Sequence, residues 1–141
     1  MNRREALLAA GVGAAAVALK ARAAGETPTA GGPPSPLIAA AFACIQVGQA
    51  CQQHCLLLLS KGDTSLSECA TTIAAMLPAC EALAQLAVQG SPRLKAFAAV
   101  CSLICRDCEQ ACAKHEKMHA ICKRCADACA ACAAQCDKVG A

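Results

Sequence analysis

The sequence predicts an all-α protein, an up-down-up-down antiparallel four-helix bundle with a cysteine-lined interior. The first observation is the spacing of cysteine, which alternates between three and four residues in CSLICRDCEQAC (101–112) and CKRCADACAACAAQC (122–136). Side chains at this spacing share one face of a helix. The second is that four stretches with such a stripe are joined by short connections. The third is composition: 14 of the 141 residues are Cys and the only aromatic residues are two Phe, so bulky apolar side chains are too few to fill the interior.

Residues 1–24 have the features of a twin-arginine-type signal peptide. Arg3 and Arg4 precede a weakly hydrophobic Ala/Gly/Val/Leu run, and the Ala-Arg-Ala segment at 21–23 offers small residues for cleavage. These features favour the twin-arginine route, with an ordinary export signal as the alternative. The apolar run is interrupted at Lys20 and is short for a membrane span, so we expect none. The expected location is therefore the periplasm or the lumen of an internal membrane.

Residues 25–36, GETPTAGGPPSP, have the composition of a flexible linker, because a segment rich in Gly, Pro, Ser and Thr cannot build a core. Its last residues, Ser35 and Pro36, suit the start of a helix. We expect the bundle to occupy 37–141.

Net charge argues against a nucleic-acid partner. The formal charge is +3, but four basic and one acidic side chain lie in 1–24, and removing them from totals of 13 and 10 leaves nine of each. A nucleic-acid-binding protein would show a basic field and often stacking aromatic side chains.

The first two helices are expected at 36–60 and from near Ser65 to the Gln-Gly-Ser-Pro segment at 89–92. The inner stripe of the first would contain Leu37, Ala41, Cys44, Val47 or Gly48, Cys51, His54 or Cys55, and Leu58. After a tight turn at 61–63, Ser65 and Glu68 have the spacing of a capping box. The inner stripe of the second helix would contain Cys69, Ile73, Met76, Cys80, Leu83 and Ala87. Pro78 should kink this helix, because Pro lacks the backbone donor.

The third and fourth helices, expected at 92–115 and 118–138, carry the two long cysteine runs. We call the end of the bundle with the connections at 61–64 and 115–118 the upper end. Counted down from there, the predicted levels are Cys55, Cys69, Cys112 and Cys122, then Cys51, Cys108 and Cys125, then Cys105 and Cys129 with Met76, and last Cys44, Cys80, Cys101, Cys132 and Cys136. At 1.5 Å per residue this column of sulfur would be about 20 Å long.

Three interpretations of the column compete. An even number of cysteines in an exported protein commonly forms a disulfide framework, but helical neighbours hold their Cβ atoms about 5–6 Å apart, whereas a disulfide needs about 3.8 Å. The thiols could also be a small apolar core, although fourteen of them would then be open to oxidation. The third interpretation, a thiolate metal store, fits the spacing best.

Soft thiolate ligands select Cu(I), Zn(II) or iron–sulfur clusters. Zinc needs four ligands in a tetrahedron, and a cluster needs four cysteines, usually from loops. One Cu(I) ion is satisfied by two thiolates, which two cysteines a helical turn apart can supply. The column could hold from about seven Cu(I) ions in exclusive pairs to about fourteen with bridging thiolates. Zinc or mixed-metal sequestration, as in metallothioneins, is the alternative.

We expect no enzyme activity from the sequence. A redox CxxC motif normally accompanies a βαβ pattern, and no strands are expected here. Neither a Ser/His/Asp group nor a pair of inward-facing carboxylates is present.

These motifs resemble those of the bacterial copper storage proteins, over the whole chain beyond the linker. The resemblance is carried by CxxxCxxCxxxC at 101–112, CxxCxxxCxxCxxxC at 122–136, CxxxC at 51–55 and the twin-arginine signal, which is similar to that of the exported branch. It implies Cu(I) held by cysteine thiolates, mainly at two-thiolate sites, and bundles assembled into a homotetramer. It also implies a reserve for a copper enzyme such as methane monooxygenase, with that enzyme or a chaperone as the partner that receives copper.

Four further side chains map to the upper end and are candidate ligands at its mouth: His54, His115, Met118 and His119. Imidazole and thioether bind Cu(I) more weakly than thiolate does, so they would suit capture and transfer inward. The family also has His and Met ligands at one end of the bundle. The alternative is that the tip of a helical hairpin carries exposed polar residues. Met76, on the inner stripe, is a candidate ligand or a core residue.

Overall fold

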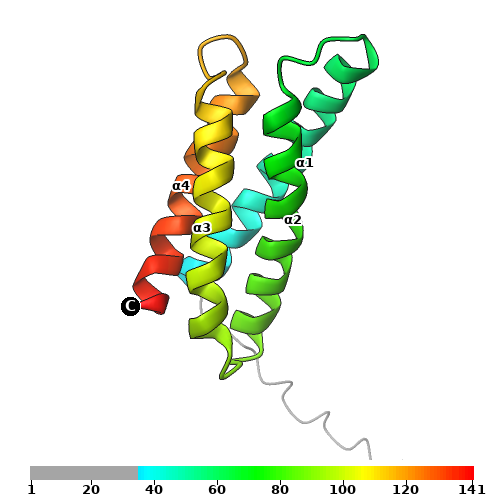
Figure 1. Cartoon of the computed structure of the whole chain (residues 1–141). Coiled ribbons are helices and arrows are strands. Elements are labelled where there is room, and N and C mark those ends of the chain that lie inside the picture. The colour runs from blue at the N-terminus through cyan, green and yellow to red at the C-terminus, as the bar shows by residue number, and fades with distance from the viewer. Residues whose placement is uncertain (1–34) are drawn as a thin grey trace, which may run out of the picture. The chain divides into compact units, whose positions relative to one another are not determined.

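The protein is described by a computed structural model, which defines residues 35–141. These residues form four helices, α1 (Pro36–Ser60), α2 (Ser67–Val88), α3 (Leu94–Ala113) and α4 (Ala120–Gly140), and they contain no strand (Figure 1). The predicted all-α class is confirmed. The predicted signal peptide at 1–24 and the linker up to residue 34 lie outside the described residues.

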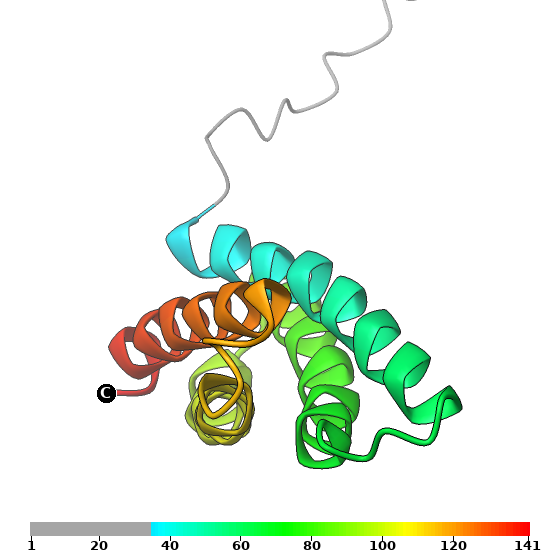
Figure 2. The same cartoon turned by 90° about the horizontal axis from the view of Figure 1, so that it is seen from above.

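The helices are arranged as a closed ring of antiparallel neighbours. Each packs against the next along the chain, and α1 packs against α4, so that α1 and α3 face each other diagonally. Figure 2, which looks along the bundle, shows α2 and α4 between α1 and α3. The connections at 61–66 and 114–119 lie together at the upper end, and the connection at 89–93 lies at the opposite end (Figure 1). The predicted up-down-up-down topology is therefore confirmed.

The ends of α1 agree with the prediction. The side chain of Ser35 accepts a hydrogen bond from the backbone N–H of Ile38 at 3.3 Å. Pro36 occupies the first turn, where its missing N–H costs no helical hydrogen bond.

The capping box predicted for the start of α2 is wrong. Ser65 does not cap the helix; its backbone N–H donates to Asp63 Oδ1 at 2.9 Å, and α2 begins two residues later, at Ser67. The N-cap is Leu66, which makes no side-chain capping bond and is fully buried. Burial of this leucine therefore fixes the start of the helix, and the capping box between Ser65 and Glu68 does not form.

The other boundaries shift by about two residues, as sequence-based boundaries commonly do. Both α3 and α4 begin two residues after their predicted starts, which leaves a longer connection at the upper end. Along α2, the helix is continuous through Pro78, so the expected kink stays a prediction.

Cysteine fills the interior. All fourteen cysteine side chains have no exposed surface. The larger side chains buried just as fully are few: Leu66, Ile73, Met76 and Leu83. The two choices left open for α1 are decided, because Gly48 and Cys55 are buried while Val47 and His54 are only partly so.

In the described part of the chain, α2 alone has the length and composition to cross a membrane, with a mean hydropathy of 1.4 over its most apolar window. Its inner face packs in the bundle through Cys69, Ile73 and Cys80. Core helices of bundles commonly have this composition, and the absence of a membrane span stays a prediction.

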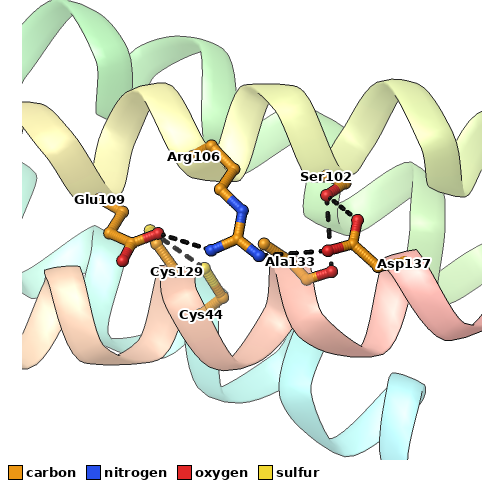
Figure 3. A network of polar contacts seen from close by, with 7 residues as sticks. All are labelled: Cys44, Ser102, Arg106, Glu109, Cys129, Ala133 and Asp137. Atoms are coloured by element: carbon orange, nitrogen blue, oxygen red, sulfur yellow. Dashed lines mark hydrogen bonds and ion pairs between the residues drawn. The ribbon is translucent and has the colours of Figure 1, made fainter.

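A polar network on the outer side fastens α3 to α4 (Figure 3). The hydroxyl of Ser102, which is only 5% exposed, donates to Asp137 Oδ1. Arg106 bridges Glu109 and Asp137 with distances of 3.1 Å to each carboxylate. The hydrogen bond from Ser102, together with Arg106, lowers the pKa of Asp137. Because the arginine pairs remain accessible to solvent, with Arg106 and Glu109 partly exposed and Asp137 about half exposed, they stabilise the fold little, and the buried hydroxyl should contribute most.

We expect Ser102→Ala to lower the free energy of unfolding by about 1–2 kcal/mol, because it removes a hydrogen bond to a charged group. Denaturant unfolding of the reduced, metal-free protein would measure this. The matched control is Ser60→Ala, which removes an exposed hydroxyl bonded to Leu57 O at 2.8 Å and should change stability by less than about 0.5 kcal/mol. Equal effects of the two substitutions would contradict the importance of the network.

Candidate metal centre

All four helices direct cysteine into the same interior. All fourteen cysteines in the described part of the chain are free thiols, so the alternative of a disulfide framework is not observed. The column receives Cys44, Cys51 and Cys55 from α1, Cys69 and Cys80 from α2, Cys101, Cys105, Cys108 and Cys112 from α3, and Cys122, Cys125, Cys129, Cys132 and Cys136 from α4.

The lower half of the column contains a four-thiol group with one cysteine from each helix. Its Sγ atoms all lie within 4.8 Å of one another, and they belong to Cys44, Cys80, Cys105 and Cys132. Within this group, Cys80 Sγ is 3.7 Å from Cys105 Sγ and 4.0 Å from Cys132 Sγ. A single ion in this region could therefore contact thiols from any of the helices.

The upper half contains three overlapping three-thiol groups, each with its Sγ atoms within 4.8 Å of one another. They are Cys51–Cys69–Cys122, Cys51–Cys112–Cys125 and Cys108–Cys125–Cys129. Cys51 and Cys125 each belong to two groups, so the groups form a continuous chain of sulfur. Across α2 and α3, Cys69 Sγ and Cys112 Sγ are 2.7 Å apart.

The predicted levels hold only in part. Cys51, predicted one level below Cys69 and Cys122, forms a group with both of them. Cys105 was expected beside Cys129, but it lies with Cys44, Cys80 and Cys132. Cys44 was expected among the deepest thiols, yet its Sγ is also 3.5 Å from Cys129 Sγ. Since one residue is 1.5 Å of helix, boundary errors of two residues are enough to account for these shifts.

The thiols perturb one another's acidity. Hydrogen bonds from Cys105 and then Cys129 lower the pKa of Cys44 to about 6. By contrast, hydrogen bonds with Cys101 and Cys105 raise the pKa of Cys80. A thiolate accepting hydrogen bonds from neighbouring thiols is stabilised, while the donors stay protonated.

The thiols nearest the upper end behave differently. Burial, followed by repulsion from neighbouring thiolates, raises the pKa of both Cys55 and Cys122. At neutral pH these two thiols are protonated, so a metal ion that binds them must displace protons.

The mouth contains a histidine pair. His54 Nε2 and His119 Nδ1 share a hydrogen bond at 3.1 Å, and their rings meet edge to face at a centroid distance of 5.0 Å. His115 is half-buried in the 114–119 connection, whereas Met118 is 82% exposed. Of the four mouth residues, the structure thus brings His54 and His119 together and leaves Met118 in solvent.

Charged side chains at the same end pair on the outer surface. Lys114 Nζ is 2.8 Å from Glu68 Oε2, and Lys123 Nζ is 3.0 Å from Asp127 Oδ2. Both pairs are exposed, so they add little to stability.

Comparison with known proteins decides the family. A family model described as copper storage protein matches residues 34–141. The chain belongs to the copper storage protein family. Its structure is similar to apo-Csp3, copper storage protein 3 of Bacillus subtilis, with a TM-score of 0.68 and 29% identity over 77% of this chain and 100% of that chain.

This copper storage protein is also similar to the Cu(I)-bound copper storage protein BsCsp3. The TM-score is 0.68 and the identity 30%, over 74% of this chain and 95% of that chain. No curated protein matches the chain significantly.

The sequence predicts every cysteine of the four close thiol groups but leaves the role of Gly48 open. A Cβ atom at this position would lie 2.5 Å from Met76 Cε. The sequence does show that the cysteine stripe of α1 is interrupted by a glycine. It does not show that the side chain of Met76 occupies the space beside this glycine, because that depends on the packing of α2 against α1.

Complete burial of the thiols in this copper storage protein predicts slow chemical modification. We expect a thiol reagent to label the folded, reduced, metal-free protein at least about tenfold more slowly than the unfolded protein, because reaction requires local opening. In guanidinium chloride the count should reach all fourteen thiols. Rapid labelling of most thiols in the folded protein would contradict the inward orientation of α3 and α4.

Proposed function

We propose that this protein stores Cu(I), holding many ions per chain on the cysteine thiolates of its interior. One observation carries the proposal: fully buried thiols form four groups, the sulfur atoms within each group lie close together, and the groups together include cysteines from all four helices. Thiolate is the soft ligand that Cu(I) prefers. The Cu(I)-bound relative shows that a similar protein takes this ion.

Sharing of thiols between groups suits high capacity. Eleven of the cysteines belong to the four groups, and the other three, Cys55, Cys101 and Cys136, lie toward the two ends of the column. Two thiolates around one Cu(I) leave a formal charge of −1, and a bridging thiolate reduces this charge per ion. Because uncompensated buried charge is costly, we infer that bridging accompanies filling. The expected capacity is about seven to fourteen ions.

Zinc fits the interior less well. A structural zinc site needs four tetrahedral ligands, and among the described residues only Cys44, Cys80, Cys105 and Cys132 form a four-thiol group. The three-thiol groups share members, so they cannot all complete separate tetrahedra. Zinc or mixed-metal sequestration therefore remains the second candidate.

Copper enters, in this proposal, through the upper end. His54 and His119 are joined there, close in sequence to Cys55 and Cys122, which begin the column. His115 and the exposed Met118 would make earlier, weaker contacts with the arriving ion. The side chains of the mouth would thus pass copper to stronger thiolate ligands below.

Export and assembly belong to the same proposal. The 1–24 segment supports delivery by the twin-arginine route to the periplasm or an internal membrane lumen, where the store would supply a copper enzyme or chaperone. Exposed apolar side chains on three helices support association into a homotetramer; they include Phe42, Leu56, Leu57, Val88, Val100 and Leu103. Mass spectrometry of the exported chain tests the signal peptide, and an uncut N-terminus would contradict it. Analytical sedimentation tests the assembly, and a monomer would contradict the homotetramer.

Titration of the reduced protein with Cu(I) under anaerobic conditions tests storage directly. We expect at least about seven ions per chain to bind ahead of a calibrated Cu(I) chelator, and zinc not to displace them. Metal counting after gel filtration provides the measurement. A capacity of two or three copper ions would contradict storage, and stronger retention of zinc would favour the second candidate.

The histidine pair should affect uptake more than capacity. We expect His54→Ala to slow Cu(I) transfer from a donor complex by about 2- to 10-fold, since it removes an intermediate ligand, and to leave the final copper count unchanged. Stopped-flow measurement of donor depletion would show this. Gln53→Ala, a change at an exposed neighbour, is the control and should load at the normal rate. A normal rate for His54→Ala would exclude a role for this residue in uptake.

A further inference from the structure

The cysteine stripes of α1 and α2 are interrupted at the middle of the column. Along α1, Gly48 stands between Cys44 and Cys51, and along α2 the fully buried residues between its two cysteines are Ile73 and Met76. At this height the thiols come mainly from α3 and α4. The thioether of Met76 is the sulfur that α2 supplies instead.

Met76 lies where the upper and lower thiol groups meet. Its side chain is fully buried, and its Sδ is 3.4 Å from Cys44 Sγ. The same Cys44 Sγ is 3.5 Å from Cys129 Sγ. Cys44 belongs to the lower four-thiol group and Cys129 to an upper three-thiol group, so the thioether flanks the contact that joins them.

Gly48 of α1 provides the space for this thioether. A Cβ atom there would approach Met76 Cε to 2.5 Å and Leu77 Cδ2 to 3.0 Å. Real Cβ atoms do not make contacts of 2.5 Å, so any larger residue would push the end of Met76 away. The backbone of α1 and the side chain of Met76 therefore fit together at this point, and the sulfur is held beside Cys44.

The distances suit a shared ion. Two sulfurs bound to one metal ion can be separated by up to about 4.6 Å when each metal–sulfur bond is about 2.3 Å. Both distances from Cys44 Sγ fall below this limit. An ion beside Cys44 Sγ could therefore bond either neighbouring sulfur, and a three-sulfur site requires Met76 Sδ and Cys129 Sγ to lie within the same limit of each other.

The chemistry of thioether suits this position. Thioether is a soft ligand for Cu(I), as thiolate is, but it carries no charge. Two thiolates and one thioether leave a charge of −1 on the site, whereas three thiolates would leave −2. In a buried region between groups that already hold thiolates, the neutral third ligand lowers the cost of desolvated charge.

We propose that Met76 is an inner copper ligand, which forms with Cys44 and Cys129 a three-sulfur Cu(I) site that links the upper and lower halves of the store. The site rests on the proposed storage function and adds a ligand to it. Cu(I) would bind the thiolate forms of Cys44 and Cys129 and the neutral thioether of Met76, with any proton on the two thiols released to solvent, so the site forms without a change in oxidation state.

Selenium absorption spectroscopy tests the proposal. The full chain is produced with selenomethionine, reduced, loaded with Cu(I) and compared with its metal-free form at the selenium K edge. We expect a copper neighbour at bonding distance from selenium in the loaded form only. Its absence from loaded protein would overturn the proposal, while a normal copper count in the same sample would leave storage intact.

Two variants assign the signal. Met76→Leu conserves volume and apolar character, keeps every thiol and should lose the selenium–copper signal. Met118→Leu, a change at the exposed methionine of the mouth, is the matched control and should retain it. A signal that persists in Met76→Leu and disappears in Met118→Leu would overturn the inner site and assign the thioether contact to the mouth. Failure of all three proteins to bind copper would overturn the storage function together with this site.

Discussion

Burial of every cysteine side chain on the inner faces of four helices is the constraint on which the rest of the structure depends. A thiol is small, so a core made of thiols cannot be filled as one made of leucine and phenylalanine is. The bundle meets this constraint by bringing sulfur atoms from different helices to within a few ångströms, as at Cys69 and Cys112. Regular helices hold these atoms in place, and the same arrangement that packs the interior also creates its ligand groups.

The fold was largely predictable because the cysteine spacing marks the inner faces of α3 and α4 without ambiguity. Prediction failed where packing across helices overrides local signals. Ser65 and Glu68 have the spacing of a capping box, but burial of Leu66 moves the start of α2 to Ser67. The choice between Val47 and Gly48 could not be made from α1 alone, because it depends on Met76 of the neighbouring helix.

The candidate site was predictable in membership and less so in detail. All fourteen cysteines reach the interior, as their spacing required. Which thiols of different helices lie at the same level depends on how far each helix is shifted along its axis relative to its neighbours. The spacing of cysteines within one helix does not determine this shift. The pairing of His54 with His119 joins residues 65 apart in sequence. Met118 lies at the mouth but is exposed, because the course of the connection before α4 cannot be inferred from the spacing of Met118 and Cys122.

The link between Ser102 and Asp137 has a consequence for the position of the sulfur atoms of α4. Rotation of α4 about its own axis by the angle between successive residues, about 100°, would turn its row of thiols away from the other three helices. Asp137 follows Cys136 directly, and its attachment to α3 opposes that rotation at the end of the chain. The alignment of the thiols thus depends in part on a hydrogen bond at the outer surface. A substitution there could disturb the interior although it replaces no interior residue.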